Sequence, residues 1–258
     1  MGIEDATGKS DIWLLNFERG TRTRLTFDPG SVHTPVWSPD GTKIYYASLR
    51  SGQRHVYAKL ANGAGREETI LNTFGLTETP IDISPDGRYL AYQRLEKVRI
   101  NIWILPLFGD RKPFPLVQSD FDAVVPKFSP DGKFVAYLGT ETGSYEVYIT
   151  PFPGGGAKWQ VSESGGIVPV WCGDGKELYY QSGNDLVAVE VREAGAGVEL
   201  GNPKRLFGLT PVSGPNGPYE LLARDGSKFL TNASPELSTP DPPVLITNWP
   251  QELKSGRQ

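Results

Sequence analysis

The fold is indicated by one tetrapeptide, Ser38-Pro39-Asp40-Gly41, which returns as Ser84-Pro85-Asp86-Gly87 and Ser129-Pro130-Asp131-Gly132. Two altered copies follow, Cys172-Gly173-Asp174-Gly175 and Ala223-Arg224-Asp225-Gly226. The aspartates are 46, 45, 43 and 51 residues apart. This spacing is close to the period of roughly 40–50 residues that is typical of β-propeller blades. Because one such unit cannot bury both of its faces alone, we expect the units to pack around an axis.

Each repeat has the composition of a small antiparallel sheet. In the tetrapeptide, proline presets the backbone for a turn, aspartate bonds back to nearby amides, and glycine accepts a positive φ. In the repeat at 31–75, strands are expected at residues 36–37, 43–47 and 55–58 and around 69–71. The second strand alternates and is rich in aromatic residues, as strands commonly are. No segment keeps a helical period over enough residues to predict a helix in place of these strands.

The sequence therefore predicts an all-β fold, a β-propeller of four-stranded blades in one domain over residues 1–258. The repeat units are expected at about 31–75, 76–119, 120–163, 164–209 and 210–249, with 11–27 as an additional part. Residues 11–26 provide only third and fourth strands, so we expect them to pair with 219–222 and 228–230 and close the ring. This arrangement favours five blades. Six are possible if 244–249 supplies the third strand of the last unit.

The composition excludes several classes of partner. The 258 residues carry a net charge of −4 without a cluster of Lys or Arg, so no nucleic-acid partner is expected. No apolar run approaches the ~18 residues of a membrane span, and residues 1–5 do not begin a signal peptide. We expect this chain to be soluble, without membrane insertion, although its compartment is not indicated. The single cysteine, Cys172, occupies the serine position of a turn, so a structural role is expected.

With these motifs in view, the chain resembles the TolB-type, WD40-like propellers built from "PD40" repeats. The resemblance rests on the pattern around each Ser-Pro-Asp-Gly and covers nearly the whole chain. Segments 11–15, 18–24, 151–154, 158–162, 175–180 and 248–250 further resemble the C-terminal propellers of bacterial serine/threonine kinases common in Acidobacteria. That likeness implies a sensor or partner-binding module, often extracytoplasmic or tethered to a membrane kinase. The kinase elements themselves are absent from this sequence.

Strand direction sorts the loops between two ends of each blade. One end carries the Ser-Pro-Asp-Gly turns, whose aspartates are expected to serve the turns. The other end carries the crossovers between blades and the loops between second and third strands, which vary and are therefore expected to hold the function. The binding candidates there are Arg50, Arg54, Thr79, Asp120, Glu163 and Asn216.

Two main hypotheses for the function follow. The first is a non-catalytic module that binds a peptide, a protein or a small polar ligand at the crossover end. The second is a hydrolase of activated esters or phosphoesters, in which His33, Glu78 and Asp122 hold a water or a divalent metal ion at the pore mouth. The first hypothesis needs no cofactor. A third hypothesis, that the domain is a structural remnant without activity, stays open.

Overall fold

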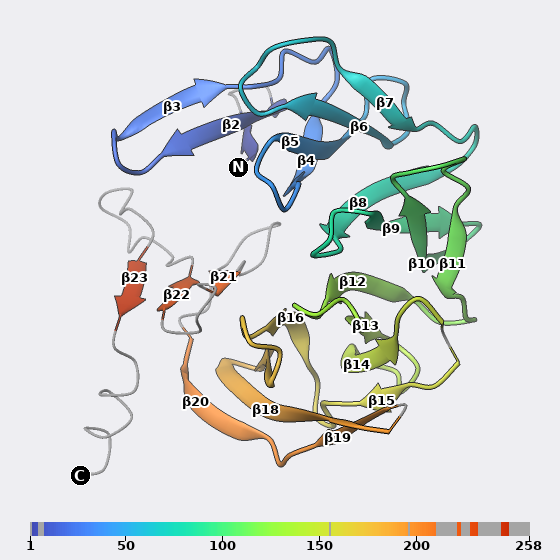
Figure 1. Ribbon diagram of the computed structural model, residues 1–258, viewed down its shortest axis with the longest axis vertical. Helices are drawn as coiled ribbons and strands as arrows, with labels where there is room; N and C mark the ends of the chain where they lie inside the picture. Colours follow the sequence, from blue (N-terminus) through green and yellow to red (C-terminus); the bar gives the residue numbers. More distant parts are fainter. Residues whose placement is uncertain are drawn as a thin grey trace. The chain divides into compact units, whose positions relative to one another are not determined.

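The computed structural model describes residues 2–4, 8–154, 156–195 and 197–209, together with the backbone of three short strands at 221–222, 228–231 and 244–247. These residues form strands and turns, and no helix among them could cross a membrane (Figure 1). The chain divides into two compact units, residues 1–126 and 127–258, which are taken in turn.

The first unit contains three antiparallel sheets within the described residues, in the strand orders β1-β2-β3, β4-β5-β6-β7 and β8-β9-β10-β11. The first sheet consists of β1 (Gly2–Glu4), β2 (Ser10–Asn16) and β3 (Thr21–Arg24). The second consists of β4 (Val32–Trp37), β5 (Lys43–Ser48), β6 (His55–Leu60) and β7 (Glu68–Leu71). The third consists of β8 (Thr77–Ile83), β9 (Tyr89–Glu96), β10 (Arg99–Pro106) and β11 (Phe114–Val117).

The second unit continues the same plan. One sheet consists of β12 (Ala123–Phe128), β13 (Phe134–Gly139), β14 (Glu146–Pro151) and β15 (Trp159–Gln160). The next consists of β16 (Ile167–Trp171), β17 (Glu177–Ser182), β18 (Asp185–Ala194) and β19 (Gly197–Leu200), and β20 (Lys204–Gly208) also pairs with β18. The last consists of β21 (Leu221–Leu222), β22 (Lys228–Thr231) and β23 (Val244–Thr247). The predicted four-stranded, all-β plan is confirmed.

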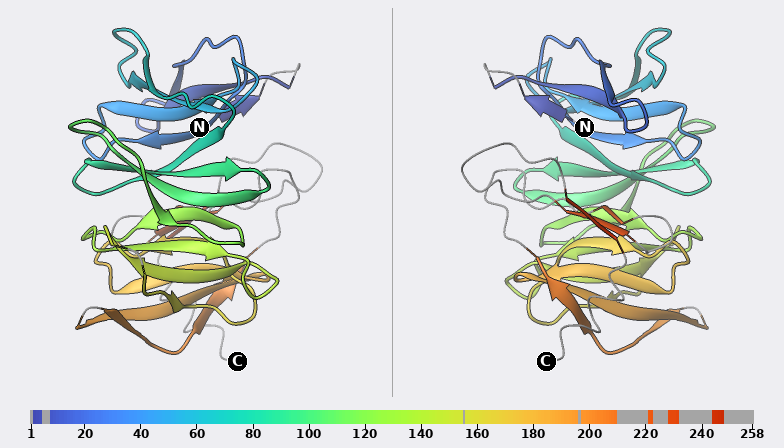
Figure 2. Two further views of the ribbon diagram at one scale, coloured as in Figure 1. Left: turned by 90° about the vertical axis from the view of Figure 1, so that its right-hand side faces the viewer. Right: turned by 90° about the vertical axis from the view of Figure 1, so that its left-hand side faces the viewer.

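The core of the first unit lies between the faces of neighbouring sheets. Figure 2 shows the second and third sheets stacked face to face. Adjacent tyrosines on β5 point to opposite faces, because side chains alternate along a strand. Tyr45 packs in the cluster with Leu90 and Tyr92 of the third sheet, whereas Tyr46 packs with Ile12 of the first. The second sheet thus buries both faces, as the repeat predicted.

The inner strands contain a feature that the repeat motif did not reveal. Thr34, Val125 and Val168 have φ values of 49°, 53° and 53°, and each directly precedes a proline. The pairing shifts register at this point in β4 and in β16. A β-branched residue with positive φ is strained, so the same strained backbone recurs in three inner strands, with a register shift in the pairing of two of them, β4 and β16.

The described strands pair differently from the predicted pairing of residues 11–15 with residues 228–230. β2 has β1 on one edge and β3 on the other, while β22 lies between β21 and β23. A strand has two hydrogen-bonding edges, and both edges of β22 are taken, so β22 has none left for β2. Residues 2–4 pair with residues 10–12 of β2, and β23 is the third strand of the last sheet. The closure of the ring by the two ends stays a prediction. The blade number stays a prediction.

Candidate functional site

The Ser-Pro-Asp-Gly turns are held by a repeated set of hydrogen bonds. In the first, the Ser38 hydroxyl donates to Asp40 (2.6 Å) and accepts from the amide of Lys43 (2.9 Å), and Asp40 also accepts from the Thr42 amide (3.0 Å). The same bonds recur at Ser84 and Ser129 with their aspartates, and Asp174 accepts from the Lys176 amide. The turn role is therefore confirmed for four aspartates, and Asp225 lies outside the described residues.

At the opposite end, three crossovers are each tied to the start of a third strand. Thr26 donates to buried Asp11 (2.8 Å), and the Ser119 amide donates to buried Asn101 (3.2 Å). Buried Glu146 accepts in the same way from the Ser162 hydroxyl. These ties fix the crossovers on the rigid sheets, so any site at this end is preorganised.

The second sheet departs from this pattern. His55 occupies the position of the acid or amide, and its buried Nδ1 has no hydrogen-bond partner. The crossover residue Thr73 donates instead to Glu78 Oε1 (3.0 Å), which also accepts from Arg94 Nη2 (3.0 Å). The Glu78 side chain is fully buried. Glu78, a predicted catalytic candidate, therefore holds a crossover in place and does not face solvent.

The other two catalytic candidates do not join Glu78 in a metal site. Asp122 accepts a hydrogen bond from the Ile100 amide (2.9 Å), and His33 is half-buried on β4 opposite Ala47. Within the described ranges, no group of three or more His, Cys, Asp or Glu side chains could hold a metal ion. The predicted metal set is thus not assembled in this part of the chain.

The remaining candidates are spread over the crossover end. Arg54 lies beside Glu78, whose amide donates to the Arg54 carbonyl (2.8 Å), and its Nε is buried without a partner. Thr79 lies on β8 opposite Gln93, and Asp120 and Glu163 are exposed. Asn216 lies outside the described residues.

Arg50 is the candidate around which other polar groups gather. Its guanidinium contacts Asp28, donates to Glu67 at 2.5 and 2.9 Å, and lies 3.9 Å from the centre of the Tyr57 ring. Gly30 allows this approach, because a Cβ there would lie 2.5 Å from the Arg50 amide. The first crossover is therefore packed directly against the loop between β5 and β6.

The cluster lines a pocket of about 190 Å³ in the first unit. Its walls are Thr26, Phe27, Asp28, Pro29, Tyr46, Arg50, Lys59 and Glu67. Burial disfavours the charged form of Glu67, but hydrogen bonds from Arg50 and Tyr46 outweigh it and hold its pKa below the ordinary value. Burial, together with the hydrogen bond to Glu67, raises the pKa of Tyr46 far above its ordinary value. At neutral pH Glu67 is therefore an acceptor and Tyr46 a donor.

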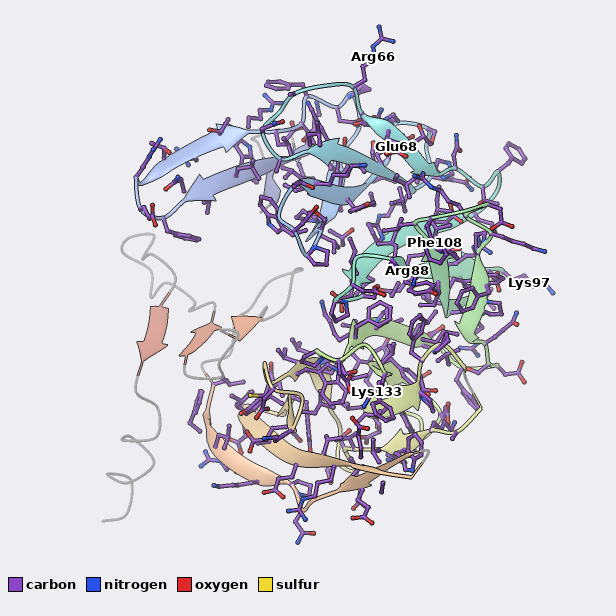
Figure 3. The ribbon with its side chains drawn as sticks, in the orientation of Figure 1. Arg66, Glu68, Arg88, Lys97, Phe108 and Lys133 are labelled. Carbon is purple, nitrogen blue, oxygen red and sulfur yellow. The ribbon has the colours of Figure 1, made fainter. Side chains whose placement is uncertain are left out.

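Sequence reasoning missed three phenylalanines at the crossover end. Phe27, Phe74 and Phe121 occupy three successive crossovers, 47 residues apart, and their exposed fractions are 72%, 100% and 44%. The constant spacing was the available signal. The turn end also has exposed aromatics, among them Phe17 and Phe108. Figure 3 shows Phe108 beside Arg88, whose guanidinium lies 4.2 Å from the ring centre.

Comparison with known proteins agrees with this architecture. No family model matches the chain. TolB from Acinetobacter baumannii superposes with a TM-score of 0.71 at 17% identity, over 95% of this chain and 59% of TolB. The fold is therefore that of a TolB-like β-propeller. A curated relative, the uncharacterized protein Atu1656 of Agrobacterium fabrum, is 34% identical over 74 residues, which is 29% of this chain.

The chain spans a quarter of the length of that relative and 59% of TolB. Propellers with other roles are also similar. An oligogalacturonate lyase in complex with manganese has a TM-score of 0.67 at 15% identity, over 97% of this chain and 70% of the lyase. A nidogen/laminin complex has a TM-score of 0.57 at 16% identity, over 76% of this chain and 73% of that one. At such identities the likeness shows the fold alone, because one fold hosts many functions.

Proposed function

We propose that this propeller is a non-catalytic module that binds a protein or peptide through its crossover loops. The observation that carries the proposal is the row of exposed phenylalanines, Phe27, Phe74 and Phe121, in three successive crossovers. The row is defined by these three residues. Burying a phenylalanine that is otherwise exposed contributes about 1.5–3 kcal/mol. A partner that covers the row would therefore gain substantial affinity.

The surroundings of the row support binding. Interface cores are enriched in aromatic side chains, and a few such residues commonly supply most of the binding energy. The ties of Thr26, Thr73 and Ser119 hold the crossovers on the sheets, so little ordering entropy would be lost on binding. The nidogen/laminin complex supplies a propeller of the same fold that binds a protein. A sensor role, implied by the resemblance to kinase propellers, is part of this proposal.

Hydrolysis is not proposed. Glu78 is bonded to Arg94 and Thr73, and Asp122 accepts from the Ile100 amide. These hydrogen bonds give both carboxylates a structural role that requires no substrate.

The test is selection from a random peptide library displayed on phage, followed by calorimetric titration of the selected peptides. Phe74→Ser and Phe121→Ser each remove one ring of the row. Phe17→Ser is the matched control, because Phe17 is 83% exposed on the turn between β2 and β3, at the other end of its sheet. We expect each row variant to weaken binding about tenfold or more and the control to leave it unchanged.

Two results would contradict the proposal. One is that no selected peptide binds with a Kd below about 100 µM, which corresponds to about 5.5 kcal/mol. The other is that Phe17→Ser weakens binding as much as Phe74→Ser does. Thermal melts of every variant check that the fold is retained.

A further inference from the structure

The pocket beside Phe27 has the size of one amino-acid side chain. Its volume of about 190 Å³ is below the ~300–1,000 Å³ of pockets that enclose whole drug-sized ligands. Phe27 and Pro29 supply exposed apolar surface, Tyr46 is fully buried in the wall, and polar groups line the rest. Such a pocket, next to an exposed ring, suits a single anchoring side chain of a partner.

The acceptors in the pocket already have donors. Asp28 is contacted by Arg50 through one oxygen and accepts from the Gly30 amide (2.8 Å) through the other. Glu67 accepts from Arg50 through both oxygens, and the Tyr46 hydroxyl donates to it as well. A carboxylate has about four lone-pair sites, so Glu67 keeps room for one further donor.

The donors are less well satisfied. Lys59 has three N–H groups, and its one hydrogen bond within the described residues goes to the Leu25 carbonyl (2.9 Å). The side chain is half-buried and belongs to the pocket wall. A ligand that enters the pocket must therefore offer an acceptor to Lys59, because a desolvated ammonium without a partner is costly.

We propose that this pocket receives a tyrosine side chain of a partner protein, an inference that rests on the binding function proposed above. The ring packs against Phe27 and Pro29. The phenolic oxygen accepts a hydrogen bond from Lys59, and the hydroxyl donates a hydrogen bond to Glu67. One group thus supplies the acceptor that Lys59 lacks and a donor for the remaining site on Glu67.

Other side chains fit these walls less well. Phenylalanine has no acceptor for Lys59, and tryptophan is larger and only donates. An acidic side chain would meet the charges of Asp28 and Glu67, and a basic one those of Arg50 and Lys59. Asparagine and glutamine offer an acceptor but little apolar surface for Phe27. Tyrosine combines the ring with a hydroxyl that both donates and accepts.

The test is an NMR titration of the protein with N-acetyl-L-tyrosinamide, with N-acetyl-L-phenylalaninamide as the matched probe. We expect the tyrosine probe to shift the amide signals of the pocket residues and to bind about tenfold more tightly than the phenylalanine probe, since a hydrogen bond to a charged group is lost with the latter. Lys59→Met should abolish this preference. Lys97→Met, at the tip of the hairpin between β9 and β10 (Figure 3), is the control and should preserve it.

A second variant controls for a change in the shape of the pocket caused by Lys59→Met. Phe27→Ser removes an exposed ring, so it should weaken both probes by a similar factor and keep the preference. The inference is overturned if both probes bind with equal affinity, or if the tyrosine probe shifts no signal of a pocket residue. If that happens while library peptides still depend on Phe74, the proposed function stands and only the pocket assignment fails. If the probe binds through Lys59 but no peptide is selected, the reverse holds.

Discussion

The buried pair of Glu78 and Arg94 allows the sharpest test of the structure. The exposed fractions of the two side chains are 0% and 9%, and the carboxylate also accepts from Thr73. Glu78→Leu would leave the buried Arg94 guanidinium with only a longer carboxylate contact, to Glu96 (3.8 Å), and would release the crossover. Breaking a buried ion pair from one side costs about 3–5 kcal/mol. Since whole domains are stable by about 5–15 kcal/mol, this loss should be severe.

Urea denaturation of a double-mutant cycle measures the effect. Glu78→Leu and Arg94→Leu are each expected to destabilise strongly, whereas the double variant should lose less than the sum by about 2 kcal/mol or more, because no buried charge is left alone. Glu163→Ala, at an exposed carboxylate of another crossover, is the control and should stay within about 0.5 kcal/mol of the wild type. A cost below about 1 kcal/mol for Glu78→Leu, or additive single effects, would refute the assignment of Glu78 as a structural group.

Three further predictions concern the strained bulge, the turns and the first crossover. Thr34→Gly should stabilise the protein by about 1 kcal/mol in urea denaturation, because it removes a positive φ at a β-branched residue and a buried hydroxyl without a partner; a loss of stability would contradict this. Burial opposes ionisation of Asp86, but hydrogen bonds from Ser84 and the Arg88 amide lower its pKa. The stability that Asp86 contributes is therefore present above its unfolded-state pKa of about 3.9, and it is lost as the pH falls through the folded-state pKa. Asp86→Asn keeps an acceptor, so stability should vary less with pH below about 4; an unchanged pH slope would contradict this. Gly30→Ala should destabilise by about 1–3 kcal/mol, because the new Cβ meets backbone atoms at 2.5–2.8 Å; an unchanged Tm would count against that packing.

The sheets and turns could be predicted from the sequence because their determinants are local. Ser, Pro, Asp and Gly each act within a few residues, and the alternation at Tyr45 and Tyr46 fixes which faces are buried. The positive φ at Thr34, Val125 and Val168 was missed, although a β-branched residue precedes proline at the same place in four repeats; the fourth, Thr79, does not adopt it. The left-handed backbone there depends on how the inner strand meets its neighbour, which no local rule states.

The end pairings could not be predicted because they depend on competition between distant segments. β1 pairs with the start of β2, with Gly2 opposite Ile12, and β22 pairs with β21 and β23. Three residues give almost no pattern by which a strand can be recognised. Pairing of this kind is decided by the whole chain.

The candidate site shows a similar division. The choice of the crossover end followed from strand direction and stays a prediction, and Arg50, a predicted binding residue, lines a pocket there. Glu78 was assigned a catalytic role because the sequence does not show whether a carboxylate in a crossover faces solvent or a buried arginine. Arg94 is sixteen residues away in the chain and on the neighbouring strand, so the pairing appears only when β8 and β9 are aligned.

The histidine at position 55 explains why Glu78 is buried. In three other sheets, an acid or amide at the start of the third strand holds the crossover, through Thr26, Ser119 or Ser162. With histidine in that position, Thr73 needs another acceptor, and Glu78 supplies it from the next strand. The carboxylate then requires a cation in the interior, which Arg94 provides. The polar groups at the base of the crossovers are thus committed to holding the loops, and recognition is left to the aromatic row and the pocket beside it.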